Sequence, residues 1–172
     1  MKKRASRKSS PASADGAPTS LATQFDDAEA SPGFVLWQVA ALWQRALRAA
    51  LDDVGLTHAQ FVLLASAMWL EGQLAARGST AVTQTEIAAH ARTDVVMTSE
   101  VLRTLERKAL LKRLPHPSDA RAKQIALTPA GRRLANKAVA LVEAADDSFF
   151  GARGPELQAL ARLLCVKSRD AK

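Results

Sequence analysis

The chain has 172 residues, of which 48% are hydrophobic, and its formal net charge is +7 at pH 7. That length allows one domain with a hydrophobic core, and the basic excess indicates a polyanionic partner such as nucleic acid, although many small proteins are basic without one. The lone cysteine, Cys165, excludes a disulfide within the chain, and no apolar run approaches the ~18 residues of a membrane span. We therefore expect a protein of a reducing compartment, the cytoplasm, with no membrane partner.

Residues 1–32 are rich in Ser, Ala, Pro and basic residues and have no apolar periodicity, so they are predicted to form a disordered tail. From Phe34 onward, apolar residues recur at spacings of three and four, which predicts a helix over 34–54 that ends at Gly55. Residues 33–172 are expected to form a single domain.

Two capping boxes mark the starts of the next helices. Thr57 and Gln60 predict one start, and Thr83 and Glu86 predict another, for a short helix over Glu86–Ala91 with Ile87 and Ala88 inside. Between them, Glu71–Val82 is predicted as a loop.

Asp94 is expected to cap a helix that runs to about Ala109. The inward face of this helix is expected to consist of Thr98, Val101, Leu102 and Leu105. Two short helices with a tight turn predict a helix-turn-helix.

A basic hairpin is predicted next. Leu111–Pro115 and Lys123–Thr128 read as two strands around a polar tip at 119–123. Thr128-Pro129 then predicts the start of a long helix that reaches Phe149. Gly151–Pro155 breaks it, and a last helix is expected over Glu156–Val166. A basic hairpin after a helix-turn-helix is typical of a wing, so the fold is predicted to be mainly α, with a winged helix over about 56–128.

The first helix and the last two lie outside a winged-helix core. Their apolar faces are expected to be buried against another surface, because several exposed Leu or Trp side chains lower solubility. The simplest cover is a twofold homodimer in which helices 34–54 and 129–167 of two chains interlock.

The chain resembles the MarR type of bacterial winged-helix transcription regulators over roughly residues 34–167. The resemblance rests on Gly55-Leu-Thr57 with Gln60-Phe61, on Thr83-Gln-Thr-Glu-Ile-Ala-Ala, on Leu102-Arg-Thr-Leu-Glu-Arg-Lys108, and above all on His116-Pro-Ser-Asp-Ala-Arg-Ala-Lys123 followed by Leu127-Thr-Pro-Ala-Gly131. It implies a homodimer on near-palindromic operator DNA, usually a repressor, released by a small aromatic or lipophilic ligand or by cysteine oxidation. The chain departs from the family where Ala109 replaces a common Gly and where the loop 71–82 looks long.

The resemblance places a recognition helix at about Asp94–Lys108 and wing contacts at Asp119, Arg121 and Lys123. Arg121 at the wing tip suits a narrow minor groove, and Asp119 would orient it, whereas the alternative is a surface ion pair. On the outward helix face, Met97, Ser99, Glu100 and Arg103 are candidates for base contacts, and the alternative is solvent. Candidate phosphate contacts are Thr83, Thr85 and Arg107, and capping alone explains Thr83 equally well.

A ligand pocket is predicted among aromatic and polar residues, with Trp37, His58, Met68 and Trp69 as candidates beside Trp43. Ordinary core and dimer packing is favoured for each of them singly, and His58 is expected to be exposed. For Cys165, burial as a small apolar residue is favoured over redox sensing.

The other function classes find less support. A protein-interaction module would show an apolar or acidic recognition face, against which the cluster of Arg103, Arg107, Lys112, Arg113 and Arg121 argues. No catalytic set, phosphate loop or metal-ligand spacing is visible, so we expect no enzyme, no cofactor and no metal.

Overall fold

The computed structural model describes residues 21–76, 81–117 and 122–167, and it divides into two compact units, residues 1–38 and 39–172. The boundary between the units falls inside α1 (Pro32–Asp52). In the first unit, Phe34 and Trp37 stack with their ring centroids 6.0 Å apart, and both rings are exposed.

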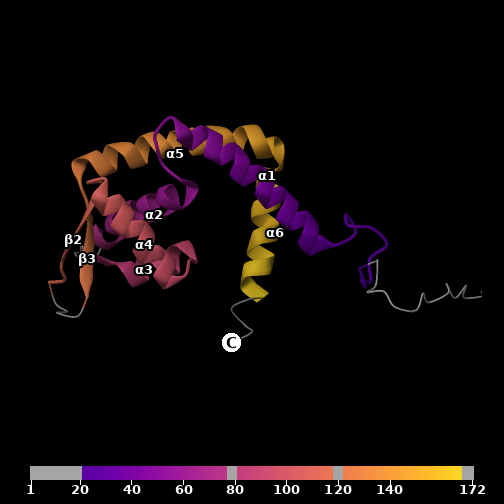
Figure 1. Cartoon of the computed structure of the whole chain (residues 1–172), viewed down its shortest axis with the longest axis horizontal. Helices are drawn as coiled ribbons and strands as arrows, with labels where there is room; N and C mark the ends of the chain where they lie inside the picture. Colours follow the sequence, from indigo (N-terminus) through magenta and orange to yellow (C-terminus); the bar gives the residue numbers. More distant parts are fainter. Residues whose placement is uncertain (1–20, 77–80, 118–121, 168–172) are drawn as a thin grey trace, which may run out of the picture. The chain divides into compact units, whose positions relative to one another are not determined.

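The second unit carries a helix-turn-helix followed by a hairpin (Figure 1). After α1 its elements are, in chain order, α2 (His58–Ala75), β1 (Val82–Thr83), α3 (Gln84–Ala91), α4 (Val95–Arg107), β2 (Leu111–Pro115), β3 (Lys123–Leu127), α5 (Pro129–Phe150), the 3-10 turn η1 (Gly151–Arg153) and α6 (Gly154–Lys167). The three strands form an antiparallel sheet in the order β1-β3-β2, with Leu111 opposite Leu127 and Val82 opposite Ile125. Figure 1 shows β2 and β3 beside the cluster of α2, α3 and α4.

The predicted helix caps are confirmed, and each of them depends on a local side-chain contact. Thr57 and Thr83 both close complete capping boxes, Asp94 accepts hydrogen bonds from the first turn of α4, and Thr128 caps α5 with Pro129 at its first position. Gly55 ends the preceding segment with φ +63°, a left-handed conformation that a side chain disfavours.

Two predicted boundaries are wrong, and one strand was not predicted. The loop expected from Glu71 begins only after Ala75, because long-range contacts of Glu71 hold α2 together past Gly72. The helix expected to reach Ala109 ends at Arg107, because Ala109 itself has a positive φ of 56°. The sheet also has a third strand, since Val82 and the residue after it pair with β3. Smaller shifts place α1 at Pro32–Asp52 instead of 34–54, the start of α3 at Gln84 and that of α6 at Gly154.

The core of the second unit joins the helices to the sheet. Its fully buried large side chains come from α1, α2, α3, α4 and all three strands: Leu47, Leu51, Leu63, Leu64, Ile87, Leu102, Leu105, Leu111, Ile125, Val82 and Thr98. These residues fix which face of α4 turns inward. Among the described residues, no helix combines the length and apolar character needed to cross a membrane.

Candidate nucleic-acid interface

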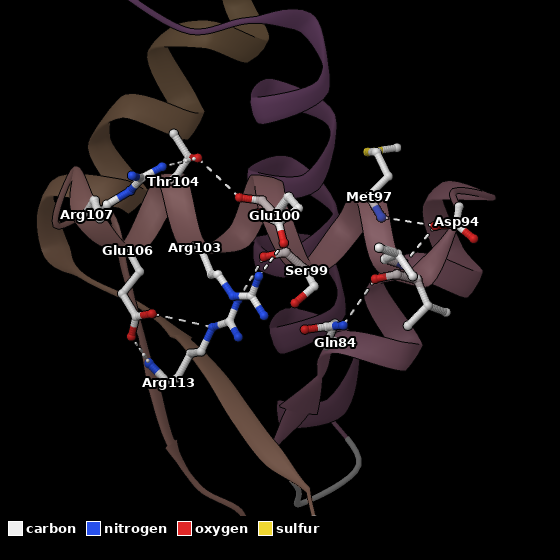
Figure 2. A network of polar contacts seen from close by, with 12 residues as sticks. Gln84, Asp94, Met97, Ser99, Glu100, Arg103, Thr104, Glu106, Arg107 and Arg113 are labelled. Atoms are coloured by element: carbon white, nitrogen blue, oxygen red, sulfur yellow. Dashed lines mark hydrogen bonds and ion pairs between the residues drawn. The ribbon is translucent and has the colours of Figure 1, made fainter.

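The N-terminus of α4 is held by one carboxylate. Oδ1 of Asp94 accepts hydrogen bonds from the backbone N–H of Val96 at 2.8 Å and of Met97 at 3.0 Å. The amide of Gln84 on α3 donates to the carbonyl of Val95 at 3.2 Å, and so links the two helices of the helix-turn-helix (Figure 2). The start of α4 is therefore fixed by both its own cap and its neighbour.

The inward face of α4 is packed as the sequence predicts. Thr98, Leu102 and Leu105 are fully buried, and the Thr98 hydroxyl donates to the carbonyl of Asp94 at 2.7 Å. The opposite face is turned to solvent and consists of Val96, Met97, Glu100, Arg103 and Arg107, with Ser99 half-buried at its edge. A helix that exposes Val96 at 70% and Met97 at 39% has room for a partner there.

Within the described residues, the charged groups on this exposed face pair with near neighbours on the same helix. Arg103 forms an ion pair with Glu100, and the guanidinium of Arg107 donates to the Thr104 hydroxyl at 3.0 Å (Figure 2). Such exposed pairs contribute little in water, about 0.2–1 kcal/mol. Their donors can therefore rearrange toward a nucleic acid at low cost.

Arg113 on β2 packs against α4 at the border of this exposed face, although the sequence did not place it among the candidate site residues. Its Nε lies 3.4 Å from Glu106 Oε2, and one terminal nitrogen donates to the carbonyl of Ser99 at 3.0 Å. Its backbone N–H donates to Glu106 Oε1 at 3.2 Å. In Figure 2 the Arg113 side chain reaches from the strand across to α4. In the sequence, only the position of Arg113 in a basic hairpin could have indicated that it contacts α4.

The remaining residues predicted to meet DNA differ in how far the structure places them. Asp119 and Arg121 lie outside the described residues, whereas Lys123 is exposed at the start of β3. The Thr83 hydroxyl is engaged in its capping box, where it donates to Glu86 at 2.8 Å. Thr85 is exposed in the first turn of α3.

A cavity of about 660 Å³ opens between α2 and α5 and reaches the last turn of α3. Its lining is mostly apolar, with polar groups from Ser66, Gln73, His90 and Asn136. Of the predicted ligand residues, Met68 and Trp69 line it together. Trp37 lies in the first unit, and Cys165 lies in α6, where its side chain is outside what the structure describes.

His58 lies away from the cavity and is half-buried, so its predicted exposure is wrong. Its ring meets the Trp43 ring edge-on, with centroids 5.2 Å apart, because α1 packs against the start of α2. The Trp43 indole N–H donates to Asp146 Oδ1 at 2.7 Å. Burial lowers the pKa of His58 below its ordinary 6.5, and the nearby carboxylate of Asp146 partly opposes this.

Comparison with known proteins agrees with this architecture. The model of the MarR family matches residues 73–123. The uncharacterized HTH-type transcriptional regulator YdcH of Bacillus subtilis is 41% identical over 130 residues, which are 76% of this chain and 85% of YdcH. The crystal structure of CouR from Rhodococcus jostii RHA1 bound to p-coumaroyl-CoA matches with a TM-score of 0.69 and 28% identity, over 82% of this chain and 93% of CouR. The transcriptional repressor CouR bound to a 23-mer DNA duplex matches with a TM-score of 0.65 and 25% identity, over 81% of this chain and 94% of that one.

Proposed function

This chain belongs to the MarR family of transcription regulators, which are not enzymes, and we propose that it is a cytoplasmic repressor that binds a near-palindromic operator as a homodimer. The observation that carries the proposal is the exposed face of α4, which carries Arg103, is fixed at its start by Asp94 and is bordered by Arg113. Such a helix fits the major groove, which presents a distinct donor and acceptor pattern for each base pair. CouR, which has the same fold, has been seen on a DNA duplex.

In this proposal some residues contact bases and others contact phosphates. Arg103 donates two hydrogen bonds to a guanine, Glu100 accepts one from a cytosine, and Met97 packs on a thymine methyl. Ser99 lies at the edge of the same contact. Phosphates are held by Thr85 and Arg107, and by Thr83 once its hydroxyl exchanges Glu86 for a phosphate oxygen. In the wing, Arg121 and Lys123 contact the minor groove, and Asp119 orients Arg121.

The homodimer is supported by exposed apolar side chains on both terminal helices. On α1 they are Phe34, Val35, Leu36, Trp37, Val39 and Leu42, and on α6 they are Leu157, Leu160, Leu163 and Leu164. A second copy that covers them would also supply the second α4 for the other half of an operator. We expect Leu160→Glu combined with Leu164→Glu to yield a monomer in sedimentation velocity, whereas Arg162→Ala should leave a dimer; a wild-type monomer would refute this part.

The cavity between α2 and α5 is the proposed effector site. Its apolar lining, with Met68 and Trp69 from one helix and His90 from α3, suits an aromatic or lipophilic molecule that has one polar end. Because His90 belongs to the helix-turn-helix, a ligand there would favour one placement of the DNA-binding helices over another. It would weaken DNA binding by no more than the ratio of its affinities for the two states.

A titration tests DNA binding directly. The DNA is the segment upstream of the chain's own gene, compared with unrelated DNA of equal length at two salt concentrations. We expect salt-sensitive binding that prefers the upstream segment, weakened about fivefold to 100-fold by Arg103→Ala or Arg121→Ala. Arg133→Ala, an exposed α5 residue, serves as the matched control. Equal, weak binding to both DNAs by the wild type would contradict the proposal.

A further inference from the structure

We propose that Arg113 is a positioning residue that fixes the direction of α4 relative to the wing, and so fixes the spacing between the bases that each reads. This inference depends on the proposed DNA-binding function and deepens it. It concerns a side chain only 21% exposed, whose polar contacts within the described part of the chain go to α4. Arg113 is thus placed to join two DNA-reading elements rather than to read a base itself.

The two contacts of Arg113 on α4 are far enough apart to set a direction. Ser99 and Glu106 are seven residues apart, which corresponds to about 10 Å along a helix axis. The buried side chains of Leu102 and Leu105 already hold α4 to the core, and Arg113 adds a polar restraint at two positions two turns apart. The guanidinium spans the two points because a terminal nitrogen donates to the Ser99 carbonyl, while Nε lies within ion-pair distance of Glu106, 3.4 Å from Oε2, without a hydrogen bond to any described residue.

The other end of this link lies in the middle of the sheet. Arg113 on β2 pairs with Ile125 of β3, and Ile125 in turn pairs with Val82 of β1. Ile125 is 1% exposed and part of the core. The contacts of Arg113 therefore tie α4 to the central strand of the sheet, the strand that continues into the wing.

Lysine cannot replace this link, although it keeps the charge. Its ammonium is one donor centre, so it cannot place two nitrogens at a fixed separation against Glu106 and the Ser99 carbonyl, as the planar guanidinium does. Arg113→Lys thus separates the positioning role from a charge role. Lys112→Ala is the matched control, since Lys112 is an exposed cation on the same strand.

The test measures the penalty for wrong spacing. The full-length protein selects its preferred sequence from a randomised DNA library, and one base pair is then inserted or deleted between the central and outer preferred bases of each half-site. We expect wild type and Lys112→Ala to lose about tenfold in affinity on the altered DNA, equivalent to one well-aligned base contact. For Arg113→Lys we expect lower affinity for the original site and a spacing penalty of less than about threefold, with the salt dependence unchanged.

Each other result overturns the inference. If Arg113 has only a structural role, Arg113→Lys should bind every DNA more weakly by the same factor and should keep the wild-type spacing penalty. A direct phosphate contact would leave both affinity and penalty near wild type in Arg113→Lys. If the wild type binds the DNA with the inserted base pair equally well, the spacing is not fixed and the inference is refuted. If the wild type selects no sequence from the library, the proposed DNA-binding function itself is refuted. If Arg113→Lys has a clearly lower melting temperature than the wild type, Glu106→Gln is the second variant. It weakens the same link, so it must also reduce the spacing penalty.

Discussion

The carboxylate of Glu71 on α2 accepts a hydrogen bond from the backbone N–H of Leu127 on β3, across 3.1 Å. Among the described residues, strand β1 pairs with β3 at residues 124 and 125, and the backbone N–H of Leu127 beyond them takes a side-chain acceptor. The Glu71 side chain supplies it, and its second oxygen lies 2.7 Å from a terminal nitrogen of Arg132 on α5. One buried carboxylate thus joins the helices of the cavity to the base of the wing.

Replacing Glu71 should show that the acceptor matters more than the charge. Glu71→Ala leaves a buried N–H of Leu127 without a partner, which costs about 1–3 kcal/mol. Glu71→Gln keeps an acceptor and loses the pair with the half-exposed Arg132, so it should cost less than about 1 kcal/mol. Urea unfolding measures both free energies, and equal losses in the two variants would contradict this account.

Gly131 in the first turn of α5 has no room for a side chain. A Cβ there would lie 1.9 Å from the carbonyl oxygen of Leu110, which is backbone and cannot swing aside. Gly131→Ala should therefore destabilise the fold by about 3 kcal/mol, at the upper end for overpacking. Gly72→Ala is the matched control: nothing lies within 4 Å of its Cβ, so it should stabilise α2 by about 1 kcal/mol. Thermal melts of both variants decide the point.

The features that the sequence predicts well are those encoded within a few residues. The capping boxes at Thr57 and Thr83 and the cap at Asp94 each join residues two or three apart, and the structure confirms all three. Apolar spacing likewise predicts the buried face of α4 and therefore its exposed one. Local chemistry thus specifies most of the helix-turn-helix.

The features that the sequence does not predict depend on distant partners. Glu71 contacts Leu127 across 56 positions, so a polar residue followed by Gly72 reads as the start of a loop although it lies inside α2. The link from Arg113 to Ser99 needs the strand to be folded against the helix before it exists. The cavity is similar: Met68 and Trp69 share it with α5, but no spacing rule separates them from His58.

Ala109 carries a conformational cost that the departure from the family pattern predicts. It follows the last turn of α4 with φ +56°, while the N–H of Leu110 donates to the carbonyl of Leu105 at 3.0 Å. This arrangement usually has Gly at the left-handed position. Ala109→Gly should therefore raise the free energy of unfolding by about 1 kcal/mol.

The matched control for Ala109→Gly is Ala140→Gly, an exposed position inside α5, which should lower the free energy of unfolding by about 0.5–1 kcal/mol. Denaturant unfolding measures the two changes under one condition. Equal losses of stability in both variants would mean that the turn after α4 relaxes away from the left-handed conformation in solution.

His58 should make stability depend on pH below neutrality. Burial lowers its folded-state pKa below 6.5, its ordinary value and the one expected in the unfolded chain. The unfolded state therefore binds a proton first as the pH falls. The stability contributed by neutral His58 is complete above pH 6.5 and is lost as the pH falls from there to the folded-state pKa.

Melting temperatures measured between about pH 7.5 and pH 5 test this linkage. Wild type should lose more stability over that interval than His58→Gln, which cannot titrate. Asp146→Asn keeps an oxygen for the Trp43 indole but removes the charge that opposes the pKa shift, so its loss should extend to lower pH than in wild type. Parallel pH profiles for wild type and His58→Gln would show that His58 has the same pKa folded and unfolded, contrary to its burial against Trp43.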